Sequence, residues 1–501
     1  MELFEADWAA KWAIYHPHKI AFKQYESGAT LKFEQLNKLG NRLAHELSVS
    51  YNLQKGDRVA VLAENCLEYL MLLAAAQKMG FILVPLNYRL AVAEIDFLLN
   101  DAQPQLVIVE DRFNQLLAET KVFPKLPCIW PLEDLKHFCD PTVELAQDVS
   151  FKNAKIEADD PLFILYTSGT TGFPKGALYT HKMLFWNSLN TAMSLIVNSE
   201  SRTVNCMPPF HTGGWNVLMM PFFHHGGYTC LLKKFDPELV LQLLESESVT
   251  IFMGVPTMLK MMAELPAFKQ TTLPNLHYII AGGEPMPIPL IEQWHQKEVP
   301  IRQGYGMTEV GPNLTSLHQE DAVRKKGSIG RPNFYVSIKI ADAQGQEKAP
   351  GQAGELLLKG PMVTPGYWRN PTATAQAIQH GWFHSGDMAI RDKEGYLYIV
   401  DRIKNMFISG GENVYPAEVE RALLSHTCIS EAAVIGVKDE KWGEVGKAFV
   451  VLTSGACITE TQLVQHCKTQ LAGFKVPKYF VFVAALPKND TGKIDRRALI
   501  K

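Results

Sequence analysis

The stretch from residue 161 to residue 180 constrains the fold of this chain more than any other part. Residues 166–176 place three glycines, three threonines, a serine and a lysine within one short loop. An apolar run at Pro161–Leu165 precedes the loop, and Gly176–Thr180 has the composition of a second short strand. The chain is therefore predicted to run from strand to loop to strand. This differs from a G-x-x-x-x-G-K-[ST] motif, in which the loop opens a helix.

The composition of this loop favours phosphate binding. Glycines allow positive φ and can turn backbone N–H groups toward an anion, while hydroxyls and a lysine add donors and charge. A plain polar hairpin turn is the alternative, but a turn rarely needs this many hydroxyls together with a lysine. The expected phosphate-binding residues are Thr167, Ser168, Gly169, Thr170, Thr171, Gly172 and Lys175.

Composition narrows the class of protein. The 501 residues carry 20% charged and 47% hydrophobic side chains and a formal net charge of -3, which gives no reason to expect a nucleic-acid partner. The first twenty residues lack the apolar core of a signal peptide, and no apolar run approaches membrane-spanning length. The eight cysteines form no C-x-x-C pair, as is typical of reduced thiols. We therefore expect a cytoplasmic enzyme.

The order of elements predicts an α/β fold. Short apolar runs alternate with helical patterns over residues 31–110 and again over 162–283, which favours layered sheets with mostly parallel strands. Residues 124–160 are less regular and are expected to connect subdomains. Residues 327–399 are rich in strands and glycine, as in a small β-rich subdomain. After residue 401 the pattern becomes that of a small α+β domain of usual size.

A second motif lies at residues 304–309, which read Gly-Tyr-Gly-Met-Thr-Glu. A tyrosine between glycines exposes its ring face for stacking, a threonine hydroxyl can donate to phosphate, and a glutamate offers Mg²⁺ a hard oxygen ligand. A loop that enters a helix, with Thr308 as N-cap, is the alternative interpretation.

Together these two motifs resemble the adenylate-forming superfamily, which contains acyl-CoA synthetases, beetle luciferases and the adenylation domains of peptide synthetases. The resemblance spans residues 33–496, with the motifs in the family's order. It implies a large N-terminal domain over residues 1–403 that binds ATP and acid. It also implies a small mobile domain over residues 404–501.

The resemblance implies a role for each matching residue. Tyr305 would stack on adenine, Thr308 and Glu309 would be catalytic with Glu309 binding Mg²⁺, and Lys493 would be the lysine of the adenylation step. Lys404, where some members carry Asp, would be the hinge. Read without the family, a lysine in a terminal loop or in Asp-Arg-x-Lys is ordinarily a solvated charge. The implied nucleotide-binding set is the loop residues above with Gly283, Glu284, Gly304, Tyr305, Gly306, Met307, Thr308, Asp387 and Arg402.

The remaining implied sites concern the acid and CoA. The acyl pocket would be bordered by His211, Gly213, Gly214 and Trp215. CoA would contact Arg89, Gly410, Gly411, Trp442 and Phe474, for which the alternatives are simple packing of the aromatic residues and a solvated charge at Arg89.

The expected activity is that of an acyl-CoA synthetase that uses ATP, CoA and Mg²⁺. Residues 213–223 carry no charged side chain, which favours a medium- to long-chain fatty acid, with an aryl acid second. A stand-alone enzyme that loads a carrier protein, a luciferase-like oxygenase and a non-catalytic nucleotide-binding protein are the rival interpretations. A monomer or homodimer is expected.

Overall fold

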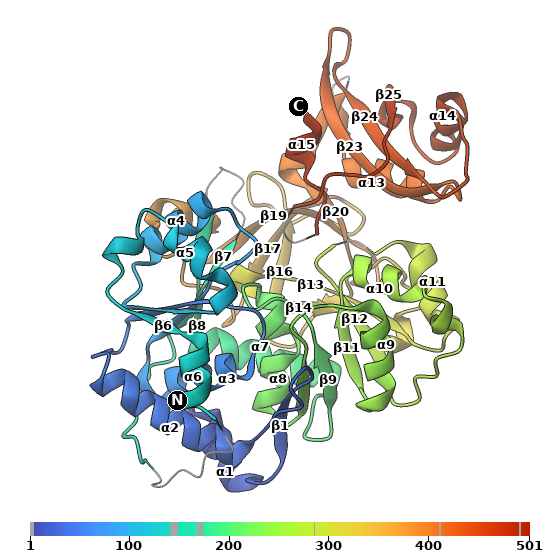
Figure 1. Ribbon diagram of the computed structural model, residues 1–501. Coiled ribbons are helices and arrows are strands. Elements are labelled where there is room, and N and C mark those ends of the chain that lie inside the picture. The colour runs from blue at the N-terminus through green and yellow to red at the C-terminus, as the bar shows by residue number, and fades with distance from the viewer. Residues whose placement is uncertain are drawn as a thin grey trace.

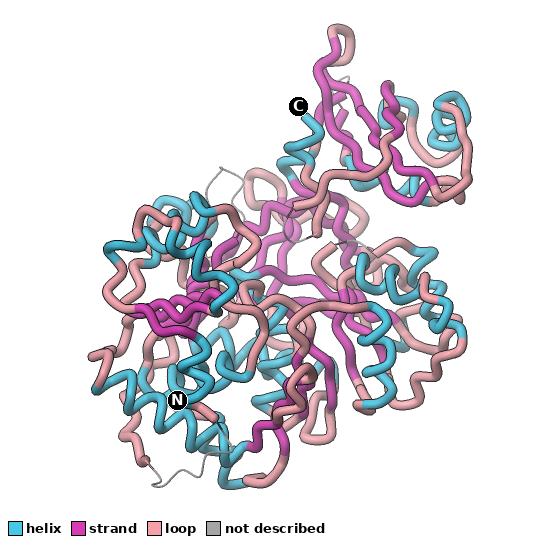
Figure 2. Tube along the Cα trace, viewed as in Figure 1, coloured by secondary structure: helices cyan, strands magenta, loops and turns pink. Residues whose placement is uncertain are grey.

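The structure is a computed structural model that describes residues 5–140, 149–167, 174–284, 286–409, 412–489 and 492–500. Figure 1 shows a large body, which carries the N-terminus, and a small unit above it, which carries the C-terminus. Figure 2 shows helices around the strands of the body. Among the described residues, no helix is long and apolar enough to cross a membrane.

A six-stranded sheet forms the first part of the body, in the order β6-β5-β3-β4-β7-β8. Five of its strands are parallel, and only β8 runs antiparallel, paired with β7. This confirms the predicted α/β class and the strand–loop–strand unit. The strands are β3 (Arg58–Leu62), β4 (Ile82–Pro85), β5 (Leu106–Val109), β6 (Ile129–Pro131), β7 (Pro161–Thr167) and β8 (Lys175–Thr180).

Strand β6 departs from the sequence prediction. Residues 124–160 were expected to be an irregular connection, but within them β6 pairs in parallel with β5 at the edge of the sheet and a helix follows it. A strand of three residues is too short to show an alternating pattern, so no periodic signal predicts it.

Three further sheets complete the body. One has the order β2-β1-β10-β9, one the order β11-β12-β13-β14-β15, and one the order β16-β17-β19-β18 with β20 paired to β19. The strands are β1 (Ile20–Gln24), β2 (Thr30–Lys32), β9 (Arg202–Asn205), β10 (Tyr228–Leu231), β11 (Ile251–Gly254), β12 (Tyr278–Ala281), β13 (Ile301–Met307), β14 (Gly311–Ser316), β15 (Arg331–Pro332), β16 (Ser337–Ala341), β17 (Gly354–Lys359), β18 (Ile378–Gln379), β19 (Trp382–Arg391) and β20 (Leu397–Arg402).

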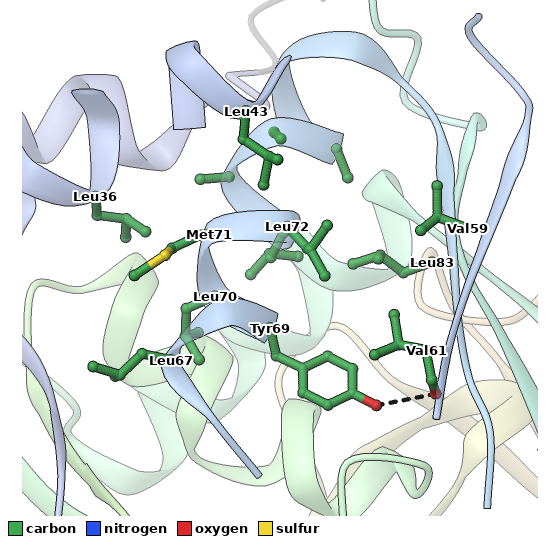
Figure 3. Packing of buried hydrophobic residues seen from close by; sticks show 14 of the residues in the cluster. Leu36, Leu43, Val59, Val61, Leu67, Tyr69, Leu70, Met71, Leu72 and Leu83 are labelled. Atoms are coloured by element: carbon green, nitrogen blue, oxygen red, sulfur yellow. Dashed lines mark hydrogen bonds between the residues drawn. The ribbon is translucent and has the colours of Figure 1, made fainter. Parts of the chain in front are cut away.

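The helices of the body cover these sheets, and α3 is the most deeply buried of the longer ones. All of its residues except Glu68 are buried, so its sequence is apolar on every side and not amphipathic. Figure 3 shows its side chains packed between neighbouring elements, with the Tyr69 hydroxyl donating to the Val61 carbonyl. The helices are α1 (Trp8–Tyr15), α2 (Phe33–Val49), α3 (Leu67–Met79), α4 (Val92–Ala102), α5 (Asn114–Ala118), α6 (Leu132–Phe138), α7 (His181–Leu195), α8 (Met219–His224), α9 (Pro237–Ser246), α10 (Pro256–Ala263), α11 (Ile288–His295) and α12 (Pro371–Ala377).

The small unit follows a 3-10 turn at Ile403–Asn405. Its sheet has the order β22-β21-β24-β23 with β25 paired to β24, and its hydrophobic clusters draw on residues from Phe407 onward. It therefore has a core of its own. Its elements are β21 (Phe407–Ser409), β22 (Glu412–Val414), α13 (Pro416–Leu424), β23 (Ile429–Asp439), β24 (Gly443–Leu452), α14 (Glu460–Lys468), β25 (Tyr479–Phe482) and α15 (Arg496–Ile500).

A buried ion pair ties the N-terminal segment to the core. The Lys78 ammonium on α3 is 2.6 Å from Asp7 Oδ2 and donates to Asn37 Oδ1 on α2 at 2.7 Å. Asn153 Nδ2 donates to the same Asp7 oxygen at 2.9 Å. Both charged side chains are almost fully buried, so each needs the other to offset its lost hydration.

Removal of one partner should therefore destabilise the body. We expect Asp7→Ala to lower the free energy of unfolding by about 3–5 kcal/mol, because the buried Lys78 ammonium is left uncompensated. Chemical denaturation followed by tryptophan fluorescence measures this. The double variant Asp7→Ala/Lys78→Met should recover most of the loss. A single-variant loss below about 1 kcal/mol, the size of an exposed pair, would contradict the assignment.

Candidate functional site

The predicted phosphate-binding loop starts and ends on paired strands. Tyr166 pairs with Gly176, and Thr167 with Lys175, across the β7–β8 ladder. Thr167 and Lys175 therefore face each other at the mouth of the loop. The predicted residues Ser168, Gly169, Thr170, Thr171 and Gly172 lie outside the described residues.

Glu309 lies beside this mouth, in a 3-10 turn (Thr308–Val310) that joins β13 to β14. Its side chain is buried, and Oε1 accepts hydrogen bonds from the Tyr367 hydroxyl at 3.0 Å and from Thr167 Oγ1 at 3.5 Å. Burial raises the pKa of the Glu309 carboxyl, and these two bonds counteract the rise. A carboxylate with hydroxyl oxygens beside it is a hard-oxygen donor set that fits Mg²⁺.

A second buried carboxylate, Asp387, lies within β19 and is held by two groups. The Tyr305 hydroxyl donates to Asp387 Oδ2 at 2.6 Å, and Arg402 Nε lies 3.2 Å from Oδ1. Burial raises the pKa of Asp387, and the Arg402 charge opposes that rise. The residue after Tyr305 must be glycine, because a Cβ on Gly306 would lie 2.1 Å from the Pro312 carbonyl oxygen. Tyr305, which is predicted to stack on adenine, is therefore hydrogen-bonded to Asp387, which is predicted to bind the ribose.

Lys493 comes from the small unit, near the chain's C-terminus. Its loop is closed by hydrogen bonds from Asn489 N to the Lys493 carbonyl at 2.8 Å and from Lys493 N to Asn489 Oδ1 at 3.0 Å. The side chain keeps contact with solvent, yet the surrounding protein lowers its pKa by desolvation, and Arg402 adds to that effect. The charges of Glu284 and Asp387 act in the opposite direction, so the three residues whose charges influence the pKa of Lys493 all belong to the predicted nucleotide-binding set.

Several known proteins resemble this chain over nearly its whole length. The AMP-binding enzyme family matches residues 9–368, and the AMP-binding enzyme C-terminal domain matches residues 418–493. A feruloyl-CoA synthase from an Amycolatopsis species is 38% identical over 488 residues, 97% of this chain and 96% of that protein. A long-chain-fatty-acid–CoA ligase of Mycobacterium tuberculosis is 36% identical over 489 residues, which are 97% of this chain and 96% of that protein. The o-succinylbenzoate coenzyme A synthetase of Bacillus subtilis, solved with ATP and magnesium ion, is 31% identical with a TM-score of 0.87, covering 99% of each chain.

The chain belongs to the AMP-binding enzyme family. It is an AMP-forming acid–thiol ligase of the acyl-CoA synthetase class, as the sequence motifs predicted. The family assignment covers the fold and the reaction class.

In this family member, His211 is held neutral. Burial, together with the charges of Lys493 and Arg89, lowers its pKa to about 4. Its Nε2 atom is buried and has no hydrogen-bond partner among the described residues. The Arg89 guanidinium lies 5.6 Å from the centre of the Phe210 ring, beside the histidine. At neutral pH His211 is therefore an uncharged polar group and not a cation.

The predicted acyl-pocket residues divide into two groups. Gly213 lies open toward the methyl groups of Met207 and Met253, which a Cβ there would approach at 3.5 and 3.9 Å. Gly214 is packed against the Pro208 carbonyl. Trp215 is fully buried: its Nε1 donates to the Pro209 carbonyl, and its ring packs 5.0 Å from that of Phe163. Trp215 therefore supports the core beneath this region.

The predicted CoA residues are spread over both parts of the molecule. Trp442 and Phe474 are 47% and 39% exposed on the small unit, and Trp442 lines an open hollow with Ile408 and Asp439. Arg89 belongs to the body, and Gly410 and Gly411 lie outside the described residues. Surface aromatics of this kind are available for stacking, which is consistent with the predicted role without testing it.

Sequence reasoning missed Tyr367, which contacts both Glu309 and Lys175. Its only sequence signal is a glycine before an aromatic pair, Gly366-Tyr367-Trp368, which by itself indicates a turn.

Two further predicted residues, Gly283 and Glu284, follow β12 as predicted. Gly283 takes a φ of 89°, and burial raises the pKa of Glu284.

The environment of Lys493 predicts a pH dependence. Its pKa is lowered from 10.5, so the ammonium loses its proton as pH rises through this lowered value. The positive charge that Lys493 is predicted to supply to adenylation is then lost. Lys493→Arg keeps the charge at high pH and should move the alkaline limb of residual ATP–pyrophosphate exchange upward. Lys488→Arg, in the same loop, is the matched control and should leave the limb in place. An unmoved limb in Lys493→Arg would assign it to another group.

Proposed function

We propose that this ligase activates a monocarboxylic acid whose remaining part is uncharged, in the first place a medium- to long-chain fatty acid, as its acyl-adenylate and transfers the acyl group to CoA. The observation that supports the proposal most is the electrostatic environment of Lys493, which belongs to the small unit. The charges of Arg402, Glu284 and Asp387, all in the body, act on its ammonium. Adenylation joins two anions, so a movable cation at this point supports the first half-reaction.

The first step needs charge neutralisation. A carboxylate oxygen attacks the α-phosphorus of ATP, and the bond to the oxygen that bridges to the β-phosphorus breaks, so pyrophosphate leaves with that electron pair. Lys493 would bridge the acid and the α-phosphate, while Lys175 and Thr167 would hold the other phosphates. Mg²⁺, held by Glu309, would supply further positive charge when bound.

The remaining nucleotide contacts have distinct tasks. Tyr305 would stack on adenine, and Asp387 with Arg402 would hold the ribose hydroxyls, since an ionised carboxylate accepts two hydrogen bonds. Thr308 would donate to phosphate. His211, neutral at pH 7, would orient the acid carboxylate without adding charge.

The second step needs another orientation of the small unit. The CoA sulfur attacks the acyl carbon, and the bond from that carbon to the AMP phosphate oxygen breaks. Lys404, within the 3-10 turn between the two parts, would be the hinge for this change. Gly410–Gly411, Trp442, Phe474 and Arg89 would then meet CoA.

The acid side of the site supports an apolar substrate. The groups around Gly213 are methionine methyls, and the charges that act on His211, from Lys493 and Arg89, are both positive and would attract the acid's own carboxylate. A second carboxylate on the substrate would need a further cation in the pocket. An aryl acid is the second candidate, because the relative that is 38% identical is a feruloyl-CoA synthase.

An acid panel tests the proposal. We expect octanoate, dodecanoate and palmitate to give CoA-dependent AMP release and acyl-CoA, with kcat/KM at least about tenfold above malonate and succinate, the factor for one unpaired charge in an apolar site. Ferulate and benzoate test the aryl alternative. Acyl-adenylate that accumulates without thioester would favour a carrier protein as acceptor. Light emission without CoA would favour an oxygenase.

The role of Lys493 predicts separable half-reactions. Lys493→Ala should lower acyl-adenylate formation by about a hundredfold or more, as when one preorganised electrostatic contact is removed. Conversion of supplied acyl-adenylate to acyl-CoA should continue, because that step joins no two anions. Lys488→Ala is the matched control in the same loop. An equal fall in both half-reactions would show that Lys493 has a different role.

A further inference from the structure

The segment from residue 364 to residue 368 runs along the free edge of β8, and it carries Tyr367. Backbone bonds join Trp368 N to the Gly176 carbonyl at 2.7 Å and Leu178 N to the Gly366 carbonyl at 3.1 Å. Ala177 and Tyr367 form an antiparallel bridge. The tyrosine is thereby fixed by backbone pairing, two residues along the ladder from Lys175.

The same segment is also bound to the turn that carries Glu309. Thr364 N donates to the Glu309 carbonyl at 2.7 Å, and Thr364 Oγ1 donates to the Leu178 carbonyl at 2.7 Å. One short stretch of chain therefore fixes the phosphate-loop strand and the acidic turn relative to each other.

The Tyr367 side chain contacts two groups of opposite charge with different parts of itself. Its hydroxyl donates to Glu309 Oε1 at 3.0 Å, and the Lys175 ammonium lies 5.3 Å from its ring centroid. An ammonium over an aromatic face is attracted by the ring's quadrupole. Among the described residues, no ion pair joins Lys175 to Glu309, although both contact this one ring.

We propose that Tyr367 is a positioning residue that keeps Lys175 and Glu309 apart and separately oriented. If the two charges met directly, each would neutralise the other, and both would be less able to bind phosphate or a cation. The ring face attracts the lysine ammonium. The hydroxyl donates to Oε1 of Glu309 and leaves Oε2 to a cation.

Two substitutions separate the two contacts. Tyr367→Phe keeps the ring over Lys175 and removes the bond to Glu309. Tyr367→Leu removes both and permits the lysine and the glutamate to meet. The inference rests on the proposed phosphate site, so ATP binding, which needs no acid substrate, is measured beside activity.

The experiment uses the full chain, ATP and a MgCl₂ concentration series. Calorimetry gives ATP affinity, and ATP–pyrophosphate exchange gives the half-saturating Mg²⁺ concentration. We expect Tyr367→Phe to raise that concentration about tenfold, the effect of losing a hydrogen bond to a charged group, with ATP affinity at saturating Mg²⁺ near that of wild type. Tyr367→Leu should weaken ATP binding at saturating Mg²⁺ as well. Glu309→Gln should resemble Tyr367→Phe.

A matched control excludes a purely structural effect. Tyr228 donates to Glu247 Oε2 at 2.7 Å in another sheet, so Tyr228→Phe removes the same kind of bond and should leave the Mg²⁺ requirement unchanged.

Conversion of supplied acyl-adenylate to acyl-CoA should survive in Tyr367→Phe. A wild-type Mg²⁺ requirement in Tyr367→Phe would overturn the inference. So would an equal loss of both half-reactions together with a lowered unfolding midpoint. Failure of the proposed function is a separate result, in which the wild-type chain forms acyl-CoA from no acid of the panel.

Discussion

The hydrogen-bonded edge of β8 is the constraint on which the site depends. One side of β8 pairs with β7 and brings Thr167 opposite Lys175, and the other side pairs with residues 364–368. Groups that lie up to two hundred residues apart in the chain thus meet at one strand. Backbone pairing sets these positions to a fraction of an ångström, which long side chains alone do not achieve. A phosphate site that must align two anionic reactants needs this rigidity.

The site contains two buried carboxylates, and each accepts a hydrogen bond from a tyrosine hydroxyl. Glu309 and Asp387 each lose hydration on burial, which raises the pKa of each. In both cases a tyrosine hydroxyl donates to one oxygen, from Tyr367 and from Tyr305 respectively. A phenol donates a hydrogen bond without bringing a full charge, so the carboxylate is oriented and favoured in its ionised form but not neutralised. Glu309 thereby keeps its charge for a ligand, whereas Asp387 is also paired with Arg402, whose Nε lies 3.2 Å from its Oδ1.

The features that sequence predicted well are those with a local chemical signature. The short apolar runs on both sides of the glycine- and threonine-rich loop predicted the paired strands β7 and β8. Two features had no such signature. Strand β6 is three residues long and cannot show a period, and Tyr367 acquires its neighbours only when residues 364–368 pair with β8. Trp215 was expected at the acyl pocket from its place in a motif, but its burial depends on packing against Phe163, which no local pattern contains.

The small unit meets the body through bonds that constrain its orientation. Asp401, at the end of β20, is buried, and its Oδ2 accepts a hydrogen bond at 2.7 Å from Ala417 N in the first turn of α13. Its Oδ1 accepts from Asn405 Nδ2 at 3.0 Å, across the 3-10 turn that contains Lys404. A carboxylate at a helix N-terminus is stabilising, because it satisfies a backbone N–H that has no partner within the helix. Asp401 precedes Lys404 and Ala417 follows it, so a rotation of the small unit about Lys404 must lengthen or break this bond. In the orientation that the structure shows, Asp401 therefore caps α13, and the proposed rotation about Lys404 would have to replace that cap with other contacts.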